Sequence, residues 1–196
     1  DALLETISFV IPEGKHLTDV ATYVESITDY TKDELLNYWN SNEFIDKAIE
    51  KYWFINNDVK NNGLRYNLEG YFFPATYEIF KNASMEEIGF KMLDKMDEVL
   101  SKYKAEIEKS KYSVHEILTL ASIVEYEAIL DSDRPMVAKV FLNRLDIGMK
   151  LESCATVGYA IDDWKLTYTY KDLQTDSPYN TYKYYGIPVG PGGLAG

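Results

Sequence analysis

The sequence predicts an α+β fold: a helix-rich domain with short strands, in which a single glutamate lies on a central, buried helix. Two observations lead to this prediction. Most segments between residues 18 and 148 repeat their apolar side chains at helical spacing. Two shorter segments, 7–11 and 66–80, instead combine β-branched and aromatic residues with nearby glycine and proline, which is typical of extended chain.

Composition narrows the possible functions. The 196 residues are 46% apolar and 27% charged, an ordinary globular composition in a chain long enough to bury a core. The net charge of −12 argues against nucleic acid or an anionic membrane surface as a partner, because both would be repelled. The single cysteine, Cys154, excludes an internal disulfide. With two histidines and no phosphate-binding or dinucleotide motif, we expect neither a metal site nor a cofactor.

The first third of the chain reads as one strand followed by helices. The strand at 7–11 ends at Pro12-Glu-Gly14, and a helix opens after Thr18. A second helix follows Thr31-Lys-Asp-Glu34, which has the form of a capping box, and a third covers roughly 43–54. The polar loop at 56–62 is the best candidate for a boundary, which would separate an N-terminal strand–helix subdomain at 1–62 from a second region at 63–196.

The middle of the chain alternates between extended and helical patterns. In the aromatic run at 66–80, Gly70 and Pro74 forbid a regular helix, and Glu69 reads as a solvated strand end. Ser84 should cap a long amphipathic helix that continues to about residue 108.

The next helix, 114–128, carries the most informative residue. Its apolar face consists of Val114, Ile117, Leu118, Ala121, Val124 and Ala128. Glu125 falls on that face, whereas Glu127 points to the opposite side. A carboxyl group in apolar surroundings has a raised pKa, which makes Glu125 a candidate general acid. The alternative, to which we give equal weight, is that Glu125 lies at the edge of the face and reaches water or an arginine.

The last third is less regular. A helix with Pro135 in its first turn should end at Gly148, and Asn143 on it offers a polar group for a site or for the surface. Residues 151–160 read as strand and loop, with Cys154 as a small buried side chain. The segment 186–196 is rich in glycine and proline and shows no apolar periodicity, so we expect it to be poorly anchored.

Four separated runs of the chain form a pattern: Leu68-Glu-Gly-Tyr-Phe-Phe-Pro-Ala-Thr-Tyr77, Ala121-Ser-Ile-Val-Glu-Tyr-Glu127, Val140-Phe-Leu-Asn-Arg-Leu-Asp-Ile-Gly-Met-Lys-Leu151 and Ser177-Pro-Tyr-Asn-Thr-Tyr182. In their order and spacing they resemble the YceG-like (MltG) endolytic murein transglycosylases. A fifth run, Ile11-Pro-Glu-Gly14, is similar to a turn in that family.

The resemblance implies a catalytic region that cleaves peptidoglycan between N-acetylmuramic acid and N-acetylglucosamine and forms 1,6-anhydro ends, with Glu125 as acid and base. It implies a substrate-binding set of Glu69, Glu127, Asn143, Ser153, Tyr179, Asn180, Thr181 and Tyr182. It implies no metal and no cofactor, and the expected partners are glycan strands and cell-wall synthesis proteins. The expected location is the extracytoplasmic face of the bacterial membrane, through an anchor absent from this chain.

The chain also departs from the family pattern. Cys154, Ala155 and Ala75 stand where the family usually has Asp, Pro and Asp. We expect the catalytic region at 63–196 to be C-terminally incomplete relative to the family. A catalytically impaired module that binds peptidoglycan or recruits a partner is therefore the main alternative. A muramidase that uses water is a third possibility, which requires a second carboxylate across the scissile bond.

Overall fold

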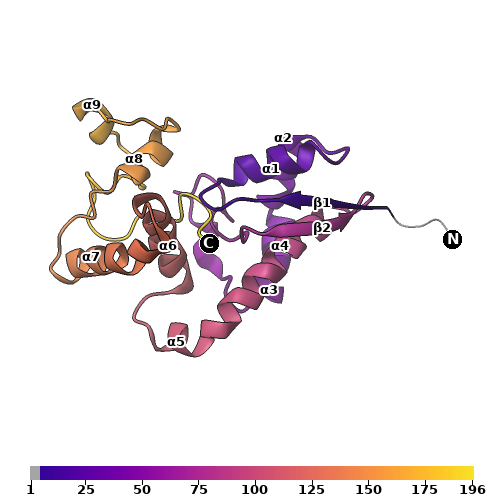
Figure 1. Cartoon of the computed structure of the whole chain (residues 1–196), viewed down its shortest axis with the longest axis horizontal. Helices are drawn as coiled ribbons and strands as arrows, with labels where there is room; N and C mark the ends of the chain where they lie inside the picture. Colours follow the sequence, from indigo (N-terminus) through magenta and orange to yellow (C-terminus); the bar gives the residue numbers. More distant parts are fainter. Residues whose placement is uncertain (1–4) are drawn as a thin grey trace.

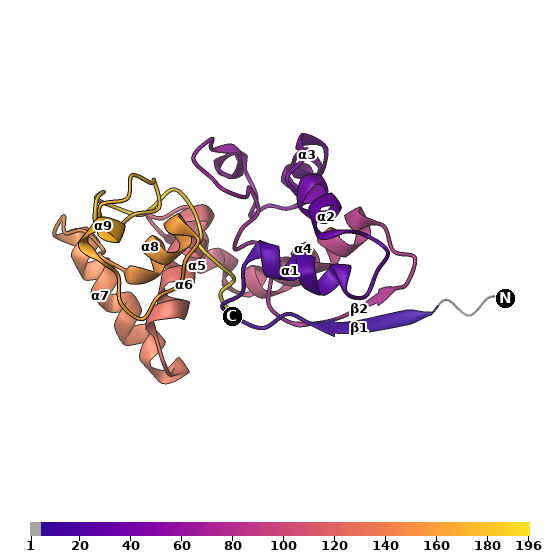
Figure 2. The same ribbon diagram turned by 90° about the horizontal axis from the view of Figure 1, so that it is seen from above.

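The computed structural model describes residues 5–196, and it confirms the predicted α+β class (Figure 1). Along the chain, the strands and α-helices are β1 (Thr6–Val10), α1 (Leu17–Glu25), α2 (Lys32–Trp39), α3 (Asn42–Lys51), β2 (Thr76–Phe80), α4 (Met85–Leu100), α5 (Lys104–Lys109), α6 (Val114–Glu127), α7 (Arg134–Asp146), α8 (Cys154–Ile161) and α9 (Tyr170–Leu173). Short 3-10 turns occupy Asn57–Lys60, Ser101–Tyr103 and Asp131–Asp133. Figure 2 shows β1 to α4 on one side of the molecule and α6 to α9 on the other.

The sheet is an antiparallel pair in which Thr6 lies opposite Phe80 and Val10 opposite Thr76. Alternate side chains of β2 are buried, as expected for a strand with one face on the core. The Ile11 amide extends the ladder by donating to the Ala75 carbonyl at 3.0 Å. The strand predicted at 7–11 is therefore confirmed to within one residue.

Side-chain caps fix where several helices begin. At α2, Thr31 Oγ1 accepts the Glu34 amide at 3.3 Å and Glu34 Oε2 accepts the Thr31 amide at 2.8 Å. Ser84 and Ser113 form the same reciprocal box at the starts of α4 and α6. Each cap contributes about 1 kcal/mol to helix stability, and both the Thr31 box and the Ser84 cap agree with the sequence prediction.

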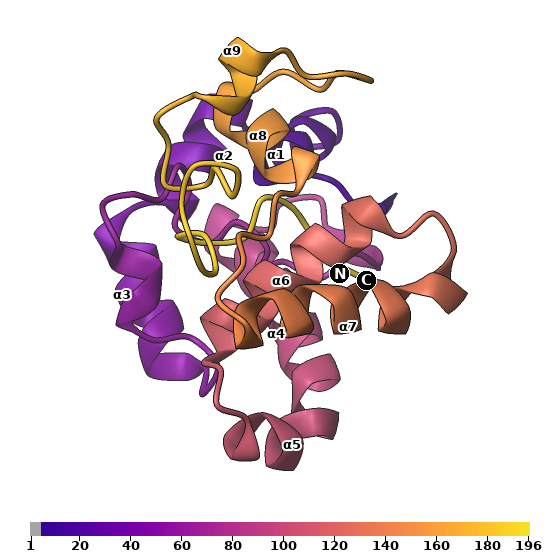
Figure 3. The ribbon, with the colours of Figure 1, turned by 90° about the vertical axis from the view of Figure 1, so that its left-hand side faces the viewer.

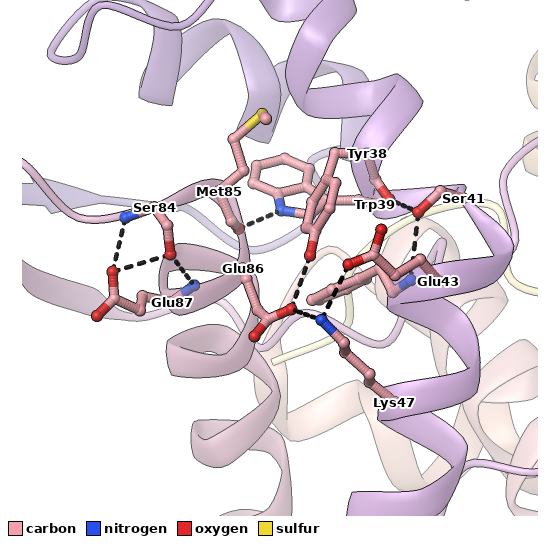
Figure 4. Close-up of polar contacts among 10 residues, drawn as sticks. Tyr38, Trp39, Ser41, Glu43, Lys47, Ser84, Met85, Glu86 and Glu87 are labelled. Carbon is pink, nitrogen blue, oxygen red and sulfur yellow. Dashed lines mark hydrogen bonds and ion pairs between the residues drawn. The ribbon is translucent and has the colours of Figure 1, made fainter.

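A polar network fastens the start of α4 to α2 and α3 (Figure 4). Glu86 Oε2 accepts the Tyr38 hydroxyl at 2.7 Å and also pairs with Lys47, which in turn lies 3.0 Å from Glu43 Oε1. Beside it, the Trp39 indole donates to the Met85 carbonyl at 2.9 Å. These bonds satisfy the polar tips of aromatic side chains whose rings lie in the core.

Buried apolar side chains form two clusters. The larger one runs from Phe9 to Leu100 in sequence and adds Leu118 and Leu194. The smaller one joins α6 to α7 through Leu120, Ile123, Val124, Phe141 and Leu151. Both sides of residue 62 contribute to the larger cluster, and the subdomain boundary expected there stays a prediction.

Two predicted helices are shorter than expected. The third ends at Lys51 because Tyr52 adopts an extended conformation, which lets Tyr52 and Phe54 turn into the core. The long helix expected to reach residue 108 ends at Leu100 and resumes as α5 after a 3-10 turn. Tyr103, which was expected on its apolar face, is exposed and has no core to hold the helix straight.

The expectation of strand and loop at 151–160 is wrong, because this segment forms α8. Thr156, Val157 and Tyr159 are buried there, and this packing overrides the β preference of the branched residues. Gly158 permits the close approach of the following loop, since a Cβ at this position would lie 2.4 Å from the Tyr168 hydroxyl and 3.0 Å from the Trp164 ring. Absence of a side chain at one position therefore determines the packing of the whole segment.

The expectation that 186–196 is poorly anchored is also wrong. Leu194 is fully buried in the larger cluster, where its amide donates to the Lys15 carbonyl and its carbonyl accepts the Gly14 amide, both at 2.8 Å. Further back, Val189 O lies 2.8 Å from His115 Nε2. The tail shows no apolar periodicity because its contacts are made largely by backbone groups and not by side chains that repeat along one face. Figures 1 and 2 show the C-terminus next to the chain that follows β1.

In the part of the chain from residue 5 onward, no helix combines the length and the apolar character needed to cross a lipid bilayer.

Candidate functional site

The candidate site surrounds the last turn of α6, which lies near the middle of the molecule beside α7 (Figure 3). Three consecutive residues at this end, Glu125, Tyr126 and Glu127, point in different directions and contact different parts of the chain. The helix stops there because Ala128 takes an extended conformation.

Glu125 is largely buried, with 10% of its side chain exposed. Its Oε1 accepts Arg134 Nη2 at 3.0 Å, and its Oε2 accepts the Gly196 amide at 3.3 Å. Burial raises the pKa of the Glu125 carboxyl, while the Gly196 amide and the Arg134 charge act in the opposite direction. The sequence predicted a raised pKa for Glu125, and this is confirmed. The alternative prediction, that Glu125 contacts an arginine, is confirmed as well.

Arg134, at the first position of α7, brings further charges to Glu125. Its Nη2 donates to Glu13 Oε2 at 2.6 Å and lies 3.3 Å from Asp131 Oδ1, and its Nη1 donates to the Gly196 carbonyl at 3.1 Å. Neither Arg134 nor Glu13 was predicted as a site residue. Glu13 belongs to the Pro12-Glu-Gly14 turn, which the sequence did indicate. Nothing in the sequence indicated that this turn lies beside Glu125.

Tyr126 connects α6 to the opposite half of the fold. Its hydroxyl donates to the Gly14 carbonyl at 2.5 Å and lies 3.0 Å from His16 Nε2. Its ring stacks on Trp164 with a centroid distance of 4.7 Å. Tyr126 therefore fixes both the turn after β1 and the loop after α8 against the end of α6.

Glu127 is exposed, and its Oε1 accepts the hydroxyl of buried Ser153 at 2.6 Å. It lines a groove of about 250 Å³ together with Phe141, Arg144 and Glu152. Glu152 has φ of 51°, a left-handed conformation that is uncommon for a residue with a side chain and that often marks functional segments. The hydrogen bond from Ser153 brings these two predicted site residues into contact.

Most of the predicted segment 179–182 faces inward. Asn180 Nδ2 donates to the Leu173 and Thr175 carbonyls at 3.0 and 2.8 Å. Thr181 Oγ1 accepts the Ser153 amide at 2.9 Å, and the Tyr179 hydroxyl accepts the Arg65 amide at 3.0 Å. These buried side chains anchor the 179–182 segment to the interior of the protein.

Tyr182 is the partly exposed member of this segment, and its hydroxyl lies 3.2 Å from Cys154 Sγ. Cys154 is exposed, so the prediction of a small buried side chain is wrong. The reason is its place at the start of α8, whose buried face begins at Thr156.

Asn143 lies on the exposed side of α7, where its side chain has no hydrogen-bond partner among residues 5–196. The neighbouring Arg144 points elsewhere and donates to the Leu151 carbonyl. The structure therefore does not bring Asn143 into contact with the other predicted residues.

Glu69 is buried, with 1% of its surface exposed, and the expectation of a solvated strand end is wrong. Its Oε1 accepts the Leu17 amide at 2.9 Å, at the first turn of α1, and its Oε2 accepts the Tyr159 hydroxyl at 3.1 Å. Burial raises the pKa of this carboxyl to about 7. Glu69 also lines a polar cavity of about 320 Å³ with His16 and Arg65.

The predicted residues therefore fall into separate places. Glu127 lines the groove and bonds to buried Ser153, while Tyr182 contacts Cys154. Glu125 pairs with Arg134, which also binds Glu13, and Glu69 lies between α1 and α8. Across residues 5–196, no group of three His, Cys, Asp or Glu side chains is placed to hold a metal ion. The side chains gathered around the α6 terminus carry carboxyl, hydroxyl, guanidinium, imidazole and thiol groups.

This protein is a helix-rich α+β domain with a largely buried carboxyl at the end of its central helix. The family model described as the YceG-like family matches residues 1–196, and the chain belongs to that family. This confirms the resemblance seen in the sequence.

Curated relatives agree with this assignment. The chain is 39% identical over 188 residues to the endolytic murein transglycosylase of Bacillus subtilis (strain 168), a match that covers 95% of this chain and 52% of the relative. It is 37% identical over 198 residues to the endolytic murein transglycosylase of Streptococcus pneumoniae serotype 2 (strain D39 / NCTC 7466), over 94% of this chain and 36% of the relative. The chain thus spans about half the length of the first relative.

A solved structure shows the same fold. The crystal structure of a yceG-like protein from Listeria monocytogenes superposes with a TM-score of 0.93 at 40% sequence identity, and the match covers 98% of this chain and 64% of that chain.

Proposed function

We propose that this chain is a catalytic region of a peptidoglycan lytic transglycosylase, which cleaves glycan strands internally between N-acetylmuramic acid and N-acetylglucosamine. The observation that carries the proposal is the Glu125 carboxyl, which is largely buried at the end of α6 and has a raised pKa. A raised pKa keeps the carboxyl protonated to higher pH, as a general acid requires. Relatives at 37–39% identity that are named endolytic murein transglycosylases support the same activity.

In the proposed reaction Glu125 donates its proton to the glycosidic oxygen, and the bond from C1 to that oxygen breaks as the oxygen departs with the electron pair. Glu125 is then a carboxylate. It takes the proton of the C6 hydroxyl of the muramyl residue while that oxygen bonds to C1, which closes a 1,6-anhydro ring. Water is not consumed, and Glu125 returns to its protonated form.

We propose that the glycan strand contacts Glu127, which lines the groove, together with Ser153, which donates to Glu127, and the partly exposed Tyr182. Tyr179, Asn180 and Thr181 support these contacts by fixing the loop from inside. Asn143 and Glu69 would contact more distant parts of the strand, at the exposed face of α7 and at the polar cavity next to Arg65.

The proposed substrate also indicates the location of the activity and the class of partner proteins. Peptidoglycan lies outside the cell membrane, so we propose an extracytoplasmic activity, with cell-wall synthesis proteins as further partners. The net charge of −12 disfavours nucleic acid as an alternative polymer substrate.

Digestion of purified peptidoglycan, followed by mass analysis of the strand ends, tests the proposal. Anhydro ends are expected from the native chain and not from Glu125→Gln. Reducing ends would instead identify a muramidase that uses water. Binding to peptidoglycan without new ends would identify the module that binds but does not cleave.

A further inference from the structure

A turn from the start of the chain brings a second carboxylate to the proposed acid. Arg134 Nη2 donates to Glu13 Oε2 at 2.6 Å and to Glu125 Oε1 at 3.0 Å. One guanidinium nitrogen therefore serves both carboxylates, and the shorter bond goes to Glu13. The turn itself is held in place, because the adjoining Gly14 carbonyl accepts the Tyr126 hydroxyl and the Gly14 amide bonds to the tail.

The groups that face Glu125 come from three parts of the chain. The turn after β1 contributes Glu13, the start of α7 contributes Arg134, and the tail contributes the Gly196 amide. Asp131 reaches the same guanidinium from the solvent side at 3.3 Å but is exposed, so water screens its charge.

These groups act on Glu125 in opposite directions. Arg134 and the Gly196 amide favour the ionised carboxylate. Burial and the negative charge of Glu13 favour the protonated form. In the proposed reaction, Glu125 must be protonated before bond cleavage and ionised after it, so neither influence should dominate.

We propose that Glu13 is a positioning residue: by sharing the Arg134 guanidinium with Glu125, it keeps the proposed acid protonated enough to donate its proton. This inference rests on the proposed role of Glu125. The inference gives the Pro12-Glu-Gly14 turn a role in the reaction. If the ion pair between Glu13 and Arg134 were purely structural, the turn would have no such role.

Glu13→Gln separates the two possibilities because it removes the charge and keeps the shape. Half of the Glu13 side chain is exposed, so the variant should fold. With Glu13 neutral, its negative charge no longer acts on Glu125 or competes for the Arg134 guanidinium, and Glu125 should titrate about 1 pH unit lower than in the native protein. The alkaline limb of the kcat/KM profile should move to lower pH by a similar amount, since the acid loses its proton earlier.

The titration is read directly from the carboxyl carbon of Glu125 in protein labelled with ¹³C-glutamate, with the signal assigned by its loss in Glu125→Gln. Glu13→Asp keeps the charge and should restore most of the native titration. Glu98→Gln is the matched control, because it removes one negative charge from an exposed pair with Lys95 on α4. It should leave both the titration and the pH profile unchanged.

The titration and the product analysis answer different questions. A Glu125 midpoint that stays within about 0.2 pH units of native in Glu13→Gln, on a variant of native thermal stability, would overturn the role of Glu13 whatever the activity, because an adjacent charge should move it by far more. A shifted midpoint in a protein that forms no anhydro ends would support the coupling of Glu13 to Glu125 and reject the proposed function.

Discussion

At the scale of single residues, the two glutamates at the end of α6 have different environments. Glu125 is largely buried beside Arg134, whereas Glu127 is exposed and bonded to Ser153. The sequence separated them correctly on the helical wheel. Burial is the property that suits a proton donor, and this difference leads to the first prediction.

Glu125→Gln should lower the rate of anhydro-end formation by at least about 10²- to 10⁴-fold, because glutamine cannot donate the proton or act as base. Glu127→Gln should lower it much less, since the amide can still accept the Ser153 hydroxyl. Turnover measured on purified peptidoglycan checks both variants. An equal loss in the two would assign the chemistry to the wrong glutamate.

Glu69 should make stability depend on pH. Its pKa of about 7 in the folded protein lies above the usual value of 4.5, so folding takes up a proton between these values. Stability from this group is full at low pH and is lost as pH rises from about 4.5 to about 7, by at most about 3 kcal/mol. Urea unfolding at pH 5 and at pH 7.5 should therefore show a smaller decrease for Glu69→Gln than for the native chain, while Glu98→Gln behaves like native protein.

Cys154 should be dispensable for activity although it is exposed. Its contact with the Tyr182 hydroxyl at 3.2 Å involves sulfur, which bonds weakly, and a serine can replace it. Cys154→Ser should keep the rate within a few-fold of native. Because the thiol contacts Tyr182, a proposed substrate-binding residue, its alkylation should slow cleavage of peptidoglycan. Loss of activity in the serine variant itself would show that the thiol takes part in the chemistry.

At the scale of elements, α8 is the segment that the sequence did not predict. Its β-branched residues favour a strand locally, and burial of Thr156, Val157 and Tyr159 selects the helix. The space left by Gly158 lets the loop with Trp164 and Tyr168 pack on it, so this glycine should be sensitive to substitution.

Gly158→Ala should destabilise the protein by about 1–3 kcal/mol, because the new Cβ would lie 2.4 Å from the Tyr168 hydroxyl. Adding Tyr168→Phe removes that oxygen and should recover part of the loss. Denaturant midpoints of the two variants and of Tyr168→Phe alone measure the coupling. A fully additive effect would mean that another contact limits the space.

At the scale of the whole molecule, the turn after β1 and the C-terminal tail meet at the proposed site. The Gly14 and Leu194 amides and carbonyls bond across this meeting point, and Arg134 contacts both Glu13 and Gly196. The environment of Glu125 therefore depends on segments more than 60 residues away from it in the sequence in either direction.

Leu194→Ala should destabilise the fold by about 2–5 kcal/mol, the usual cost of truncating a fully buried leucine. Leu166→Ala is the matched control, because Leu166 is fully exposed and its truncation should change stability little. Hydrogen exchange provides a second measurement: the Gly14 and Leu194 amides should be protected in the native chain and lose protection in Leu194→Ala. Fast exchange of both amides in the native chain would show that the tail is not anchored.

The sequence by itself determined the local features of this protein. Capping residues such as Thr31 and Ser84 act within a few residues of themselves, and helical periodicity placed α6 and Glu125 correctly. Tertiary structure decided the rest: the burial of Glu69, the helix at α8, the anchored tail and the pairing of Glu13 with Arg134. Each of these depends on contacts between segments that are distant in sequence. Packing contributes free energy only when those segments meet, and this contribution outweighs the local preferences of the residues involved.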